Sequence, residues 1–211
     1  MSKGTNTKAK IITKSAELFN SYGYHGCSLS DIMTATKLQK GGIYNHFKNK
    51  DEIATEAFDY SYNRVIKRFR KLLGEANTPL QKLYTVIDAF ASFADDPVVK
   101  GGGCPIFNTA MDSTNTHPKL KQKARMGIES LITYVEIKLR EGMDAGVFRK
   151  DVDIKEFASL LIMTLEGAII MSRVQDHDLS VRIASDFMKK HIQQKLLLTS
   201  DKRGAEKKSD S

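Results

Sequence analysis

Tryptophan is absent from this chain of 211 residues, and cysteine and proline are scarce, with two and four residues respectively. Cys27 and Cys104 lie far apart in the sequence, so they provide neither a disulfide framework nor the paired spacing of a zinc site. The few prolines and the lack of sustained alternation between apolar and polar residues favour helices over strands. We therefore expect an all-α protein with an ordinary buried core.

No apolar stretch is long enough to suggest a membrane span. Residues 1–10 lack the apolar core and the small-residue cleavage site of a signal peptide. The most apolar segment, residues 157–171, is short and is interrupted by Glu166. We therefore expect a cytoplasmic protein with no membrane partner.

Positive charge is in excess, with 33 Lys and Arg against 25 Asp and Glu, a formal net charge of +8. This balance suits a polyanionic partner, but it would suit a membrane surface equally well. The distribution favours nucleic acid, because the first fifty residues contain eight lysines and only two acids, Glu17 and Asp31. The alternative is a generally lysine-rich, solvated surface.

Apolar residues recur at helical spacing along most of the chain, and capping residues mark where helices begin. Ser28 with Asp31 resembles a capping box, and Gly23 is well placed to end the first helix in a left-handed conformation. Pro105 follows three glycines at an expected helix start, and residues after 199 are polar and are expected to be disordered. The other expected helices span residues 6–22, 28–36, 50–73, 78 to about 96, 116 to 142 or 146, 153–171 and 180–198.

Residues 38–53 read LQKGGIYNHFKNKDEI and have the pattern of the end of a helix-turn-helix. Ile43 and Phe47 stand four residues apart, so on a helix they share one face that can be buried. Polar residues occupy the outward positions, where they can donate to phosphates and base edges. These outward residues are Gln39, Lys40, Tyr44 and Asn45, while Gly41 and Gly42 leave the backbone of the first turn open to a phosphate.

The run KGGIYNHFKNKDE, residues 40–52, resembles the core signature of the TetR family of bacterial repressors, which reads roughly S-K-G-T-L-Y-x-H-F-x-S-K-E-E-L. The match is ungapped and continues upstream through Ser28 to Ile32, so it covers about the first quarter of the chain. Gln39 stands where the family usually has a capping Ser or Thr, and Gly42 where Thr or Ala is common. Both departures bear on the operator sequence more than on the fold.

The resemblance implies a three-helix DNA-binding domain in residues 1–50, a larger helical ligand-binding and dimerisation domain in residues 51–199, and a tail in residues 200–211. It implies a dimeric transcriptional repressor that binds a palindromic operator on double-stranded DNA and is released by a small-molecule effector. The expected phosphate contacts are Tyr44, His46, Lys48, Lys50 and the amides of Gly41 and Gly42, and the candidates for base edges are Gln39, Lys40 and Asn45. His46 could instead be a packing residue under the turn.

The resemblance also implies a ligand pocket in the second domain and a homodimer. The segment 157–171 is apolar almost all the way round, so we expect it and the last helix to pack against their copies in a four-helix bundle; a purely internal core is the alternative. Glu166 in this segment either lies exposed at an edge or meets a polar group or ligand. The candidate pocket residues are Tyr84, Phe90, Cys104, Phe107, Asn108, Met111, Tyr134, Met163 and Glu166, each of which could also be ordinary core.

Three other functions compete with a ligand-released repressor. A DNA-binding protein without a ligand would need only the helix-turn-helix. Cys104, near an expected helix start, could sense oxidants or electrophiles if its thiol were activated, although a small buried residue is the simpler interpretation. An enzyme is not expected, because Cys104 and His117 lack a third orienting residue and the five histidines form no metal-binding pattern. No cofactor is expected.

Overall fold

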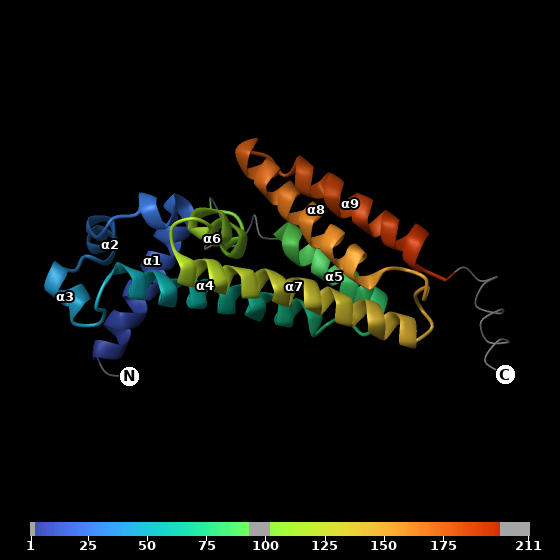
Figure 1. Ribbon diagram of the computed structural model, residues 1–211, viewed down its shortest axis with the longest axis horizontal. Coiled ribbons are helices and arrows are strands. Elements are labelled where there is room, and N and C mark those ends of the chain that lie inside the picture. The colour runs from blue at the N-terminus through green and yellow to red at the C-terminus, as the bar shows by residue number, and fades with distance from the viewer. Residues whose placement is uncertain (1–2, 93–101, 199–211) are drawn as a thin grey trace. The chain divides into compact units, whose positions relative to one another are not determined.

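The computed structural model describes residues 3–92 and 102–198, and within these ranges the regular structure is helical (Figure 1). The expected helix end near residue 96 and the expected disordered tail after residue 199 lie outside the described residues. The elements are α1 (Lys3–Gly26), α2 (Leu29–Thr36), α3 (Lys40–Tyr44), α4 (Lys50–Leu73), α5 (Pro79–Ala91), α6 (Pro105–Ser113), α7 (Pro118–Asp144), α8 (Ile154–Val174), α9 (Leu179–His191) and a π-helix (Ile192–Leu196).

The described chain divides into two compact units. The first contains residues 3–68 and 102–128, and the second contains residues 69–92 and 129–198. Besides α1, α2 and α3, the first unit holds most of α4, the whole of α6 and the beginning of α7. The expected DNA-binding segment, residues 1–50, is therefore folded together with later parts of the chain.

Caps and one glycine set the helix boundaries in the first unit. Gly23 has φ of 75°, a left-handed conformation that costs glycine little, and it kinks α1 at the predicted position before the helix continues to Gly26. Ser28 and Asp31 form the predicted capping box at the start of α2. The core beneath these helices comprises Ile11, Cys27, Ile32, Ile43, Phe47 and Ile53, each at most 2% exposed.

In the second unit, α5, α8 and α9 pack against one another (Figure 1). Thr78 caps α5 in a capping box with Gln81, and the Asp153 side chain accepts a hydrogen bond from the Glu156 backbone at the start of α8. The helices expected from the sequence begin at the same two residues. The Phe157 ring stacks on His191 with the ring centroids 5.7 Å apart, so α8 and α9 run antiparallel.

The last helix differs from the prediction of one continuous helix over residues 180–198. The α-helix ends at His191, a π-helix follows, and Leu197 is extended and forms an isolated antiparallel bridge with Phe148. The Arg149 amide donates to the Leu196 carbonyl (2.8 Å), and the Leu198 amide donates to the Val147 carbonyl (3.3 Å). Pairing with the turn between α7 and α8 requires extended backbone, which a continued helix cannot provide.

By length and composition, α8 could cross a membrane, since its most apolar 18-residue window has a mean hydropathy of 1.6. In this fold, however, 44% of that window is buried inside a single chain. The helix packs against α5 and α9 and carries buried Leu161, Ile162 and Leu165. We therefore interpret α8 as a core helix of the second unit.

The end of α7 leaves no room for a side chain at Gly142. A Cβ there would lie 2.0 Å from Cδ2 of Phe148, which is fully buried. We expect Gly142→Ala to lower the free energy of unfolding by about 2 kcal/mol, because overpacking outweighs the better helix propensity of Ala. Urea denaturation followed by circular dichroism measures this change. Phe148→Leu should cost less in the Gly142→Ala background than alone; additive costs would show that the ring is not the obstacle.

Candidate nucleic-acid interface

The turn between α2 and α3 directs one face of α3 inward. Lys37 adopts a left-handed conformation (φ 56°) at the end of α2, and Gln39 is extended just before α3. Ile43 and Phe47 are then 0% and 2% exposed, whereas Tyr44 between them is 43% exposed. The predicted buried and outward faces of the recognition segment are both present.

The outward face of α3 carries donors that make no hydrogen bond within the described chain, although the Lys40 ammonium lies 5.8 Å from the centroid of the Tyr44 ring. Gln39, Lys40, Gly41 and Asn45 are exposed, and the Gln39 side chain does not cap the helix. The backbone N–H groups of Lys40 and Gly41 make no hydrogen bond within the described residues, as expected for the first turn of a helix. The Gly42 amide is already hydrogen-bonded within the protein, because it donates to the Gln39 carbonyl at 2.9 Å.

The turn that follows α3 is fixed by hydrogen bonds at the start of α4. The Asn49 side chain accepts from the Glu52 amide (2.9 Å), and the Glu52 carboxylate accepts from the Lys48 amide (2.6 Å). This reciprocal arrangement satisfies donors at the helix start and places acidic charge in its first turn. The Lys48 side chain itself stays exposed.

Lys50 has a partner that the sequence did not reveal. Its ammonium donates to the Tyr24 carbonyl (2.6 Å) and lies 4.2 Å from the centroid of the Tyr24 ring. The Tyr24 hydroxyl donates to Asp51, and burial, reinforced by that carboxylate, raises the pKa of Tyr24 to about 12. Lys50 therefore ties the start of α4 to the end of α1, and its ammonium is only partly available to DNA.

His46 lies half-buried beside the first turn of α1. A Cβ built on Gly4 would be 3.9 Å from Cε1 of His46, which is ordinary van der Waals contact. This position fits the packing alternative for His46 at least as well as a phosphate contact.

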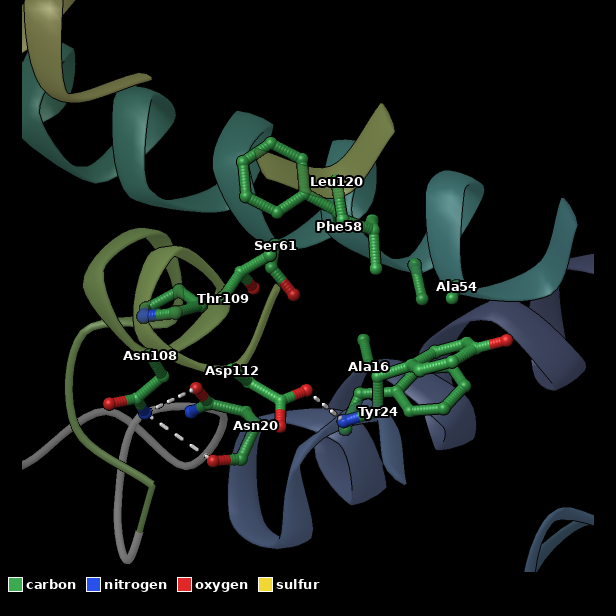
Figure 2. A pocket seen from close by; sticks show the side chains of 13 residues that line it. Ala16, Asn20, Tyr24, Ala54, Phe58, Ser61, Asn108, Thr109, Asp112 and Leu120 are labelled. Carbon is green, nitrogen blue, oxygen red and sulfur yellow. Dashed lines mark hydrogen bonds between the residues drawn. The ribbon is translucent and has the colours of Figure 1, made fainter. Parts of the chain in front are cut away.

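A polar cluster joins α1 to α6 (Figure 2). The Asp112 carboxylate accepts from the Tyr24 amide at 2.6 Å, and the Asn108 side chain donates to the Asn20 side-chain oxygen at 2.9 Å. Asn20 in turn donates to the Gly103 carbonyl (3.1 Å). The cluster borders a cavity of about 30 Å³, which has room for a water molecule but not for an organic effector.

The predicted pocket residues fall in both units. Cys104, Phe107, Asn108 and Met111 belong to the first unit, and of these Asn108 lines the small cavity beside α1. Met111 is 78% exposed. The residues Tyr84, Phe90, Tyr134, Met163 and Glu166 belong to the second unit.

Within the second unit these residues have different surroundings. The Phe90 ring meets Phe69 edge to face (5.3 Å between centroids), and Met163 is 57% exposed. Burial, with a smaller contribution from Glu141, raises the pKa of Tyr134 to about 12. Glu166 is 2% exposed, so the alternative that it lies exposed at an edge is wrong.

Neither cysteine has the surroundings of a reactive thiol. Cys104 is 2% exposed at the start of α6, and Cys27 is 1% exposed, where burial raises its pKa to about 11. Reactive cysteines are accessible and have lowered pKa values. The His117 Nδ1 accepts from the Leu120 amide (3.2 Å), so this nitrogen caps α7. Among the described residues, no three His, Cys, Asp or Glu side chains could hold a metal ion together.

Helices α8 and α9 each leave an apolar stripe uncovered in the single chain. On α8 the stripe follows helical spacing through Leu160, Met163, Ile170 and Val174, which are 45–77% exposed. Gly167 lies within it, and a Cβ there would meet nothing within 4 Å. On α9 the stripe comprises Leu179, Ile183 and Phe187, which are 47–61% exposed. We refer to these two sets as the α8–α9 stripe.

A helix-turn-helix whose second helix exposes amide, ammonium and backbone donors is the architecture of a DNA-binding protein. Comparison with known families agrees. Residues 11–57 match the model described as "Bacterial regulatory proteins, tetR family", and residues 79–188 match "Tetracyclin repressor-like, C-terminal domain". The chain belongs to the TetR family of transcriptional regulators.

Solved structures extend the likeness over the whole fold. A TetR transcriptional regulator from Chloroflexus aurantiacus J-10-FL is 36% identical, with a TM-score of 0.90 and coverage of 94% of this chain and 100% of that one. A TetR family regulator from Cytophaga hutchinsonii is 30% identical, with a TM-score of 0.84 and coverage of 94% and 99%. The all-α fold, with an N-terminal helix-turn-helix domain and a larger C-terminal helical domain, is thereby confirmed.

A curated relative supports the same class of function. The HTH-type transcriptional repressor DhaR of Mycobacterium sp. (strain GP1) is 23% identical over 172 residues, which cover 81% of this chain and 84% of the relative. The protein is thus a DNA-binding transcriptional regulator, and its family is one of regulators rather than of enzymes.

Proposed function

We propose that this protein is a dimeric repressor that binds a palindromic operator and is released from it by a small-molecule effector. The observation that carries the proposal is the division of the recognition segment into two faces. Ile43 and Phe47 anchor it in the core, and the exposed donors of Gln39, Lys40 and Asn45 point away from that core. Such a face can enter the major groove and read bases.

Positioning and reading fall to different groups. The Tyr44 hydroxyl, the Lys48 ammonium and the free amides of Lys40 and Gly41 suit phosphates. Asn45 and Gln39 suit adenine, whose N6 and N7 they can bind with two hydrogen bonds, and Lys40 suits guanine. We give Lys50 and His46 supporting roles, because both are packed against α1.

Two recognition helices would be supplied by a homodimer formed through the α8–α9 stripe. A two-fold axis brings the same stripe of both subunits together at one interface. Pairing α8 and α9 with their copies then gives a four-helix bundle that covers the exposed apolar side chains. The operator should then contain two half-sites about one helical turn apart.

Effector binding is assigned to the helices after Thr78, with Tyr84, Phe90, Tyr134 and Glu166 as the buried or half-buried candidates. Two features could pass its effect to the DNA-binding helices. Helix α4 and helix α7 each have residues in both compact units. An effector would act by favouring a dimer geometry in which the recognition helices no longer fit two successive grooves.

Selection of binding sites from random duplex DNA tests this function. At near-physiological salt, wild type should enrich one palindrome. Asn45→Ala should bind this site more weakly by about 1–3 kcal/mol per half-site and lose selectivity at one base pair. Tyr44→Phe should weaken binding without changing the preferred sequence. Salt-sensitive binding to all duplexes with no enriched sequence would contradict a specific repressor and favour non-specific attachment.

A further inference from the structure

Lys37 ends α2 in the turn that leads to the recognition helix, and its backbone conformation is unusual for a lysine. Its φ of 56° and ψ of 35° lie in the left-handed region. Its amide donates to the carbonyls of Met33 and Thr34, and the Leu38 amide donates to the Met33 carbonyl (3.2 Å), a closure of the helix that requires this conformation. Glycine adopts it at little cost, whereas a lysine does not. The strained backbone points to a role for the lysine side chain.

The surroundings of the Lys37 side chain in the sequence carry positive charge alone. The side chain is exposed, and it forms no hydrogen bond or ion pair within the described part of the chain. Residues 32–50 contain four lysines and no Asp or Glu. The acids that border this segment, Asp31 and Asp51, lie in the first turns of α2 and α4, where the positive end of each helix dipole favours them. The segment that holds the recognition helix is therefore complementary to phosphate.

Lys37 and Lys48 lie beyond opposite ends of α3. Lys37 is the third residue before this helix, Lys48 is the fourth residue after it, and both are exposed. Helix α3 has five residues and is thus about 7.5 Å long, whereas the major groove is about 12 Å wide between its two backbones. Long side chains just outside both ends of so short a helix can reach the two backbones while the helix faces the bases.

We propose that Lys37 and Lys48 form a phosphate clamp, in which Lys48 binds the backbone on one side of the major groove and Lys37 binds the backbone on the other side. The inference rests on the proposed DNA-binding function and adds Lys37, to which that function assigns no role. Contacts to both strands fix the depth and angle at which α3 enters the groove. Base readout by Gln39 and Lys40 then depends on Lys37, although Lys37 itself reads no base.

The first test compares Lys37→Asn with Lys150→Asn by measuring operator affinity against salt concentration. Asn tolerates the left-handed conformation, so Lys37→Asn removes the ammonium and keeps the turn. Lys150 is an exposed lysine of the second compact unit that has no side-chain partner among the described residues. Lys37→Asn should reduce the salt slope by about two per dimer and weaken binding about tenfold. Lys150→Asn should match wild type, and Lys37→Arg should retain wild-type affinity.

The second test locates the contact by ethylating single phosphates of the operator. In each half-site one phosphate should inhibit wild type when it is ethylated but have no further effect on Lys37→Asn. Lys48→Ala should become insensitive to a different phosphate, on the strand across the groove. The clamp is wrong if Lys37→Asn has the affinity and salt slope of Lys150→Asn, or if it keeps the wild-type pattern of inhibition.

Thermal unfolding shows whether a loss of affinity reflects a damaged fold. Lys37→Gly should be at least as stable as wild type, because glycine relieves the left-handed strain, and should nevertheless lose affinity as Lys37→Asn does. Lys48→Ala separates failure of the clamp from failure of the proposed function. If Lys48→Ala weakens operator binding but Lys37→Asn does not, the repressor stands and only the clamp is wrong. If wild type selects no operator at all, both proposals are wrong.

Discussion

Phe187→Glu is expected to convert an operator-binding dimer into a folded monomer. Phe187 is 57% exposed in the single chain, where it shares the α8–α9 stripe with Ile183. In a two-fold interface the substitution buries two carboxylates in an apolar contact, at a cost of about 3–5 kcal/mol apiece. The dimer dissociation constant should therefore rise at least a thousandfold, as sedimentation at micromolar concentration would show.

Operator affinity should fall when the dimer is lost, because a monomer presents one recognition helix and reads a single half-site. The circular dichroism spectrum should be retained, since the changed side chain is largely outside the core of the single chain. Met126→Glu is the matched control: Met126 is 61% exposed on α7, belongs to the first compact unit and is not part of the stripe, and its replacement should leave the dimer intact. A dimeric Phe187→Glu protein that binds operator normally would show that another surface forms the dimer.

Local features of this fold could be predicted from the sequence because their chemistry is local. The caps at Ser28, Thr78 and Asp153 depend on a side chain and an amide three residues away, so the helix starts were right. The same holds for the two faces of the recognition segment, which follow from the helical spacing of Ile43 and Phe47.

Contacts between residues that lie far apart in the sequence could not be predicted from such local patterns. Lys50 meets Tyr24 from 26 residues away, and Asp112 meets Tyr24 from 88 residues away. No spacing rule links such positions, so Lys50 was predicted as a free phosphate contact and Tyr24 was overlooked. The bridge between Phe148 and Leu197, which ends the last helix, is of the same kind.

The ligand pocket was the hardest part to predict, for a physical reason. Apolar side chains at helical spacing show which face of a helix is covered, but not whether protein, ligand or a second subunit covers it. Met163 illustrates this, because it was assigned to the pocket and lies exposed on the α8–α9 stripe. Glu166 was singled out for the cost of burying an acid, and it is indeed buried.

Gly41→Ala is expected to weaken operator binding about a hundredfold, because each of the two subunits loses a phosphate contact of about 1–1.5 kcal/mol. The folded protein should be as stable as wild type or more stable. Gly41 is exposed in the first turn of α3, and a Cβ there would meet nothing within 4 Å. Ala also favours a helix over Gly by up to about 1 kcal/mol. Any loss of affinity must therefore come from the DNA side.

The expected loss of affinity follows from how closely a phosphate must approach the Gly41 backbone. The Gly41 amide is free, so a phosphate can reach it only if no side chain intervenes. Gly42→Ala is the matched control, because the Gly42 amide already donates to the Gln39 carbonyl. A Cβ at Gly42 would lie 3.6 Å from Leu38, in the turn before α3. Operator titration and thermal unfolding of both variants decide the matter. Equal losses of affinity at the two positions would mean that either change distorts the start of the helix. If Gly41→Ala binds the operator with wild-type affinity, the Gly41 amide is not a phosphate contact.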